Sequence, residues 1–209
     1  MSENLKKRFF TSLALFVLLF LMIKNNYILG YLILIIGVLS VLEFFQMTSK
    51  IFKNKKFGFI FVNSFFIFYI FGLCALFISL SFYVYLKIVI FIILLTCIAS
   101  DIGGFVIGKT IRGKKLTRIS PNKTISGAVG SIVFSSIAIS IMIFYITQRY
   151  DPLIIIAGFV ISLACQIGDL MISSLKRKSN MKDTWSLLPG HGGILDRIDG
   201  ILLGLPVGF

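Results

Sequence analysis

The chain has 209 residues, the length of one domain, and 57% of them are hydrophobic, which excludes an ordinary soluble domain. The formal net charge is +13, but the basic residues are spread between apolar runs, so we expect no nucleic-acid partner. We expect instead an all-α, polytopic integral membrane protein. It forms a single membrane domain over 1–209, with N-terminal membrane helices in 1–80 and catalytic helices and loops in 81–209.

Apolar runs predict seven membrane helices, at residues 9–23, 27–47, 57–80, 82–100, 125–147, 152–172 and 193–208. Helices are the expected spanning element, because a backbone exposed to lipid must satisfy its own hydrogen bonds. The cysteines, Cys74, Cys97 and Cys165, lie alone within apolar runs and are expected to be lipid-facing or packing residues with no metal or redox role.

The basic residues distinguish the two sides of the predicted bundle. The segments before the first helix and after the second, fourth and sixth helices hold 17 of the 21 Lys and Arg residues, whereas the opposite loops hold only Lys24 and Arg149. The positive-inside bias therefore predicts a cytoplasmic N-terminus and cytoplasmic polar loops. We expect the membrane to be a bacterial inner membrane.

Acidic residues are few, and most of them lie in the second half of the chain. Of the eight, Glu3 and Asp151 are expected to be solvated, and Glu43, inside the second helix, is expected to have a structural partner. Asp169 lies within an apolar run, where a carboxylate costs about 2.5–3.5 kcal/mol near the bilayer centre. It shares a helix stripe with Ser173 and Lys176 at i, i+4 and i+7, so an ion pair that only holds helices together is an alternative to a role in chemistry.

Two further aspartates, Asp196 and Asp199, are spaced i, i+3 and project from one face of the next helix. With Asp169 they predict a cluster of three carboxylates, which repel one another unless a cation lies among them. Hard oxygen ligands suit Mg²⁺, with or without a second cation, and Mg²⁺ is commonly shared with substrate phosphates.

Phosphate-binding features surround these acids. Glycines precede the last helix, and basic side chains are available for phosphate oxygens. The candidates are Gly190, Gly192, Gly193, Lys176, Arg177, Lys182 and Arg197. A second polar segment begins near Asp101 and contains Asn122 and Lys123 just before the fifth helix, where a phosphate could also bind; all three are candidate substrate contacts.

One segment matches a nucleotide-binding pattern by chance. Residues 103–110, "GGFVIGKT", satisfy the P-loop spacing. A P-loop requires a preceding strand and exposed backbone N–H groups, whereas here a membrane helix precedes and the variable positions are apolar. We therefore interpret this match as accidental.

Two stretches of the second half resemble a known family. "SSLKRKSNMKDTWSLLPGHGGILDRID", preceded by "QIGDL", resembles the signature of the phosphatidate cytidylyltransferases, and "SPNKTISGAVGS" resembles a second stretch typical of them. The resemblance implies a magnesium-dependent membrane enzyme that converts CTP and phosphatidate into CDP-diacylglycerol and pyrophosphate. Trp185 departs from the family pattern, which usually has Gly there. The sequence stops at Phe209, so we expect the last helix to be shorter than the family's usual C-terminal span.

The family's site residues carry over by motif position. The resemblance places metal and catalytic roles on Asp169, Asp196 and Asp199, and substrate contacts on Ser173, Lys176 and Arg177. His191 and Arg197 match fixed positions of the motif, and we take His191 as a substrate contact. The candidate catalytic residues are Asp169, Asp196, Lys176 and Arg197.

The expected partners are CTP, phosphatidate and membrane lipid. A homodimer is a further possibility. In the expected reaction, an anionic phosphatidate oxygen attacks the α-phosphorus of CTP and pyrophosphate leaves, so catalysis depends on positioning and charge neutralisation. Alternatives are a cytidylyltransferase for another phospholipid, such as an ether lipid, and a transporter with intramembrane carboxylates. The DGxxAR signature of CDP-alcohol phosphotransferases is absent.

Overall fold

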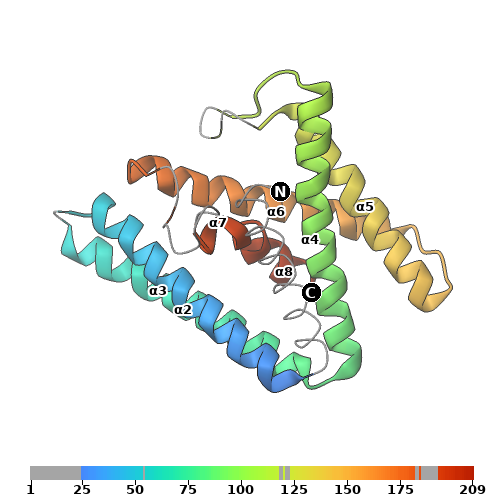
Figure 1. Ribbon diagram of the computed structural model, residues 1–209, viewed down its shortest axis with the longest axis horizontal. Coiled ribbons are helices and arrows are strands. Elements are labelled where there is room, and N and C mark those ends of the chain that lie inside the picture. Colours follow the sequence, from blue (N-terminus) through green and yellow to red (C-terminus); the bar gives the residue numbers. More distant parts are fainter. Residues whose placement is uncertain (1–24, 54, 118–119, 121–122, 182–183, 185–192) are drawn as a thin grey trace, which may run out of the picture.

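The computed structural model describes residues 25–53, 55–117, 120, 123–181, 184 and 193–209 (Figure 1). Regular structure in these residues is helical: α2 (Asn26–Ile51), α3 (Lys56–Ser81), α4 (Val84–Ile111), α5 (Ile125–Thr147), α6 (Leu153–Lys178), α7 (Leu195–Ile198) and α8 (Ile201–Gly208). The five long helices, α2 to α6, are apolar and long enough to cross a membrane. The predicted all-α membrane class is thus found in the described residues, whereas the predicted helix at 9–23 lies outside them.

Two long helices continue beyond their predicted ends. We expected a polar loop from residue 100 and a helix end at residue 172, but α4 runs to Ile111 and α6 to Lys178. Polarity alone does not end a helix, because the backbone hydrogen bonds continue whether the side chains are apolar or not. Consequently "GGFVIGKT" is an internal part of α4, and its interpretation as an accidental P-loop match is confirmed.

The last predicted helix is wrong as a single element. Residues 193–208 form two short helices, α7 and α8, which are separated at Asp199 and Gly200. The Gly200 N–H donates to Oδ1 of Asp199 at 2.8 Å, so the side chain takes a donor that a continuous helix would use. Neither piece is long enough to be a candidate membrane span.

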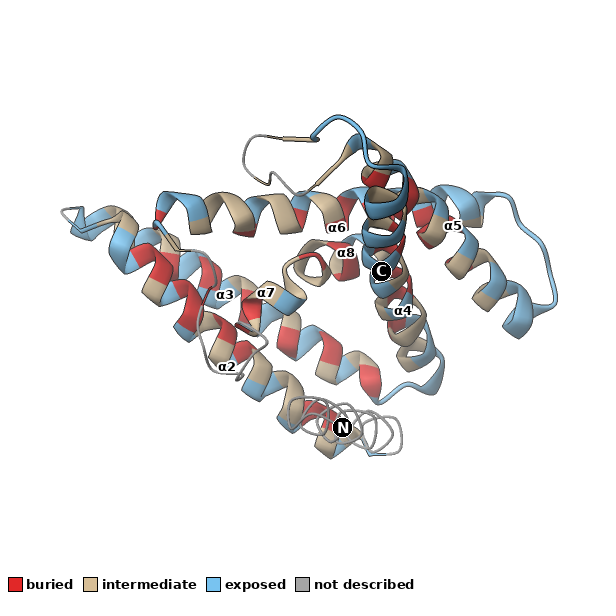
Figure 2. Ribbon diagram, turned by 45° about the horizontal axis from the view of Figure 1, so that its top comes forward, coloured by how far each residue is buried: buried red, intermediate tan, exposed pale blue. Residues whose placement is uncertain are grey.

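The long helices form two pairs joined by the remaining elements. Helices α2 and α3 lie side by side, as do α4 and α5, and α6 packs against α5 and α8 (Figure 1). Exposed residues run along the outer faces of the long helices, whereas buried residues gather where the pairs approach α7 and α8 (Figure 2). The two short helices therefore lie inside the molecule, between the α2–α3 pair and the α4–α5 pair.

Glycines bring the backbones of α4 and α5 together. A Cβ added to Gly103 would lie 2.6 Å from the Gly130 carbonyl oxygen, and one added to Gly130 would lie 2.5 Å from the Ile107 Cβ. Small residues at such crossings allow close backbone approach, which drives helix association in membranes. This close pairing fixes the position of the α4 residues next to Gly103, including Asp101.

A buried carboxylate connects α2 to the C-terminal helices. Glu43 is fully buried, and its oxygens accept hydrogen bonds from the backbone N–H groups of Ile194 (2.7 Å) and Leu195 (2.8 Å) and from the Thr184 hydroxyl (2.7 Å). The carboxylate therefore caps the N-terminus of α7 from another helix, where the helix dipole favours negative charge. The expected structural partner of Glu43 is confirmed.

We predict that Gly130→Ala destabilises the protein by about 1–3 kcal/mol, because its methyl group has no room at the α4–α5 crossing. Gly72→Ala in α3 is the matched control: no atom lies within 4 Å of the added Cβ, so this change should stabilise the helix by up to about 1 kcal/mol. Thermal unfolding in detergent measures both. Equal midpoints for the two variants would contradict the packing described here.

We predict that Glu43→Ala lowers the free energy of unfolding by about 1–3 kcal/mol for each buried donor that loses its acceptor. Glu43→Gln keeps one acceptor oxygen and the side-chain volume, so its loss should be smaller. The three buried free cysteines report unfolding through a thiol-reactive dye. A Glu43→Ala variant as stable as the wild type would show that the cap does not hold α7.

Candidate functional site

A cavity of about 430 Å³ opens where α4, α5, α6 and α7 approach one another. Four carboxylates and two lysines line it, together with small and polar residues of α5 and the segment before it. The lining residues are Asp101, Gly104, Phe105, Leu116, Ser120, Lys123, Thr124, Gly127, Ala128, Ser131, Gln166, Asp169, Lys176, Asp196 and Asp199. The cavity therefore combines acids that are far apart in the sequence.

Asp169 is held by a cation and a hydroxyl. Its Oδ2 forms an ion pair with Nζ of Lys123, and its Oδ1 accepts a hydrogen bond from Ser173 at 3.1 Å. The side chains of Lys123 and Asp169 are 26% and 27% exposed, so the pair is screened from most but not all solvent. We expected Lys176 as the ion-pair alternative for Asp169. The structure instead supplies Lys123, from the other side of the cavity.

Asp196 is surrounded by donors. Its Oδ1 pairs with Nζ of Lys176 at 2.6 Å, and its Oδ2 accepts from the Thr184 N–H (2.9 Å) and the Gly193 N–H (3.3 Å). The Thr184 hydroxyl lies 3.0 Å from the same oxygen, but its one proton is shared with Glu43, which is nearer at 2.7 Å. Burial acts to raise the pKa of this carboxyl, but the hydrogen bonds from Lys176 and Thr184 outweigh it and lower the pKa. Asp196 is therefore a fixed anion that also holds Lys176 in place.

Asp199 has the opposite environment. Burial, followed by the negative charge of Asp169, raises the pKa of its carboxyl. Asp101 contributes further negative charge, while Lys176 partly offsets it. The carboxylates of Asp101, Asp169 and Asp199 thus repel one another within one cavity, which is the condition under which a cation binds favourably.

The donor chemistry of the cavity fits a hard divalent cation. Carboxylate oxygens from α4, α6 and the α7–α8 junction line it, and Mg²⁺ prefers oxygen ligands. Among the described residues, no group of three acidic, histidine or cysteine side chains is arranged to hold a metal ion, so the predicted cluster of Asp169, Asp196 and Asp199 is not found as a ligand group. Mg²⁺ in proteins is commonly held by one or two carboxylates together with substrate phosphates and water.

The N-terminus of α5 opens onto the same cavity. Thr124 caps this helix by accepting the Gly127 N–H at 3.1 Å, and both residues line the cavity beside Lys123. A helix N-terminus with an adjacent lysine favours phosphate oxygens. The predicted placement of Lys123 just before the fifth helix is confirmed, and it puts positive charge opposite the acids.

The remaining predicted residues divide into three groups. Arg177 and Arg197 are exposed and do not line the cavity, while Ser173 contacts it only through Asp169. Gly193 is buried, and its N–H donates to Asp196; a Cβ there would lie 1.9 Å from Thr184 Oγ1, so only glycine fits. Asn122, Lys182, His191 and Gly192, with Asp183, Trp185 and Gly190, lie outside the described residues.

Sequence reasoning missed several residues that build the site. Gln166 lines the cavity and donates to the Ala128 carbonyl at 3.2 Å, which connects α6 to α5. Its position three residues before Asp169, on the same helix face, was an available signal. Thr184, which bridges Glu43 and Asp196, gave no such signal, because its partners are 141 and 12 residues away.

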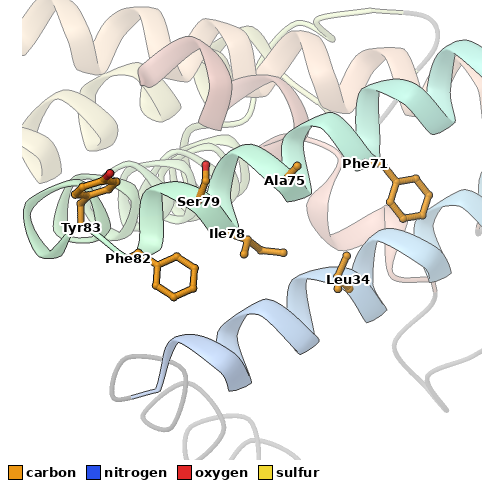
Figure 3. A pocket seen from close by; sticks show the side chains of 7 residues that line it. All are labelled: Leu34, Phe71, Ala75, Ile78, Ser79, Phe82 and Tyr83. Carbon is orange, nitrogen blue, oxygen red and sulfur yellow. The ribbon is translucent and has the colours of Figure 1, made fainter.

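A larger hollow of about 860 Å³ on the outside of α2 and α3 has a different character (Figure 3). Its lining is mostly apolar and carries no charged side chain: Leu34, Phe71, Ala75, Ile78, Ser79, Phe82 and Tyr83. A groove of this kind suits lipid contact but offers no group for phosphate or metal binding. The polar cavity is therefore the candidate functional site.

Comparison with known proteins identifies the family of the chain. The model of the cytidylyltransferase family matches residues 4–209. The phosphatidate cytidylyltransferase of Rickettsia typhi is 33% identical over 210 residues, covering 94% of this chain and 85% of the relative. That of Bacillus subtilis is 32% identical over 186 residues, covering 83% and 65%.

Other relatives are longer than the chain. The phosphatidate cytidylyltransferase of Mycobacterium leprae is 38% identical over 115 residues, which cover 54% of this chain and 36% of the relative. The chain thus spans about one third of that protein, and it spans 42% of a Helicobacter pylori relative of the same name. The family match nevertheless extends over nearly the whole sequence and includes every residue that lines the polar cavity. The chain therefore belongs to the cytidylyltransferase family.

Proposed function

We propose that the protein transfers a cytidylyl group from CTP to phosphatidate, giving CDP-diacylglycerol and pyrophosphate. The observation that carries this proposal is the polar cavity, in which four carboxylates, two lysines and the α5 N-terminus meet among helices that are apolar enough to span a membrane. A nucleotide and a phospholipid bring several negative charges together, and such a cavity supplies both cations and cation ligands. The names of the relatives favour phosphatidate over an ether lipid as the acceptor.

The reaction requires positioning more than a strong base. A phosphatidate oxygen, already anionic, forms a bond to the α-phosphorus of CTP while the bond from that phosphorus to the bridging oxygen breaks and pyrophosphate leaves. Lys123 and the α5 N-terminus lie where phosphate oxygens would bind on one side of the cavity. Lys176, held by Asp196, provides positive charge on the other side.

Asp169 and Asp199 are the residues that would hold Mg²⁺, with or without a second cation, and Asp101 lines the same cavity. When bound, the ion neutralises charge on the reacting phosphates. Asp196 has a different role in this proposal, because Lys176 and the backbone N–H groups of Thr184 and Gly193 already donate to it. It fixes Lys176 and the backbone around Gly193, so it acts mainly through the groups that it positions.

The orientation in the membrane is part of the proposal. We infer six membrane segments, namely the expected helix at 9–23 and α2 to α6, with a cytoplasmic N-terminus and a cavity that opens to the cytoplasm of a bacterial inner membrane. The concentration of Lys and Arg in alternate loops supports this orientation, and CTP is a cytosolic substrate. The bacterial origin of the relatives supports the choice of a bacterial membrane. A transporter is the less favoured reading, because the acids gather in one cavity with lysine partners.

The proposal predicts that purified protein supplied with CTP, Mg²⁺ and phosphatidate forms CDP-diacylglycerol. Asp196→Asn should lower kcat by about 10²-fold or more, because it weakens the hold on Lys176 at the point where phosphate charge develops. Asp151→Asn is the matched control: Asp151 caps α6 through the Leu153 N–H far from the cavity, and asparagine caps equally well. Equal rates for Asp196→Asn and the wild type would refute the assigned site.

A second prediction concerns the lysine before α5. Lys123→Gln should lower kcat/KM for CTP by about 10-fold to 100-fold, because it removes the cation beside Asp169 and the α5 N-terminus. Lys115→Gln removes the same charge from an exposed lysine of the same segment and should change kcat/KM little. Steady-state kinetics at varied CTP measures both. Equal losses would mean that the effect comes from net charge and not from position.

A further inference from the structure

A second cavity of about 270 Å³ lies on the other side of the α7–α8 segment, among α2, α3 and α4. Its walls are almost wholly apolar and include Ile33, Ile70, Phe77, Leu94 and Leu202. No acidic residue lines it, in contrast to the polar cavity. The protein therefore has two neighbouring cavities of opposite character.

The few polar groups in this second cavity are already paired. The Ser40 hydroxyl donates to the Ile36 carbonyl at 2.6 Å, and the Ser81 hydroxyl donates to the Ile78 carbonyl at 2.7 Å. At the far end, Lys87 donates to Asn26 Oδ1 at 2.7 Å. Water in a cavity needs two to four polar partners, so this cavity does not suit water. It suits an apolar occupant, which recovers the dispersion contacts that an empty space forfeits.

The two cavities share their boundary. Asp199 lines the polar cavity, whereas Ile198 and Leu202, on either side of it in the sequence, line the apolar one. The α7–α8 segment thus presents a carboxylate to one cavity and apolar side chains to the other. Whatever binds in the apolar cavity therefore lies beside the segment that positions Asp199.

One face of α4 also runs from one cavity to the other. Leu94, in the apolar cavity, and Asp101 and Phe105, in the polar cavity, are spaced i, i+7 and i+11, so they share a face of the helix. Between them on the same face is Ile98, whose side chain is 44% exposed. This face gives an apolar path about two helical turns long between the two cavities.

We propose that the apolar cavity binds one acyl chain of the lipid substrate while the lipid phosphate lies in the polar cavity. This inference rests on the proposed function, and it adds a chain-length requirement to it. The cavity volume is roughly that of nine water molecules, at about 30 Å³ each. The cavity therefore holds a stretch of the tail and not the whole lipid. A short tail ends along α4 before it reaches the apolar cavity, so it gains no dispersion contacts with the cavity walls.

The test compares phosphatidates with long tails (18 carbons) and short tails (6 carbons) as substrates. Leu94→Trp fills the cavity, so the ratio of kcat/KM for the long substrate to that for the short one should fall at least fivefold. Leu95→Trp is the matched control, because Leu95 is adjacent, 46% exposed and outside both cavities. An unchanged ratio in Leu94→Trp, or the same fall in both variants, would overturn the proposal.

A second pair of variants, with phenylalanine in place of isoleucine, tests the same cavity in case the tryptophan variant misfolds. Ile33→Phe fills the cavity from the α2 wall, and Ile35→Phe places the same ring on an exposed position of α2, 51% exposed in the wild type. The ratio should fall only for Ile33→Phe. A loss of activity that is equal for both tail lengths reports a structural defect and counts against the acyl-chain site.

A binding measurement separates this inference from the proposed reaction. Purified wild-type protein is irradiated with a phosphatidate that carries a photoreactive group near the end of one tail. The label should appear in peptides containing Leu94 or Leu202 and should decrease in Leu94→Trp, even if no CDP-diacylglycerol is formed. Labelling confined to the outer faces of the helices, or to residues 1–24, would show that the tail does not enter the cavity.

Discussion

The structure depends on how negative charge is compensated among apolar helices. Asp101, Asp169, Asp196 and Asp199 line one cavity in a protein whose long helices suit a membrane. Two of these acids have lysine partners, Lys123 for Asp169 and Lys176 for Asp196. The other two form no ion pair with a described side chain, and Lys176 offsets the negative charge around Asp199 only in part, which is why the cavity favours a divalent ion and the phosphates that accompany it.

The fold supplies this arrangement through two unusual contacts. Close backbone approach at Gly103 and Gly130 sets α4 against α5, and this brings Asp101 toward Lys123. The buried carboxylate of Glu43 caps α7 and, through Thr184, connects to Asp196. An N-terminal helix therefore contributes to the site without lining it, because it fixes the segment that carries two of the acids.

Much of this could be predicted from the sequence, because the signals were local. Apolar runs predicted the long helices, and the exceptional aspartates predicted the acids of the cavity. The rest depended on contacts between distant residues. The partner of Asp169 proved to be Lys123 and not Lys176, and the separation of α7 from α8 lies at Asp199, whose side chain accepts the Gly200 N–H. Helix spacing alone predicts neither, since it does not tell which helices approach one another.

Carboxylates from α6 and the α7–α8 junction are proposed to hold one divalent cation between them. Electron paramagnetic resonance of Mn²⁺, titrated into the purified protein and displaced by Mg²⁺, measures this binding. Asp199→Asn and Asp169→Asn should each weaken Mn²⁺ binding at least tenfold, whereas Asp151→Asn should leave it unchanged. Binding of Mn²⁺ with wild-type affinity by both cavity variants would contradict the claim.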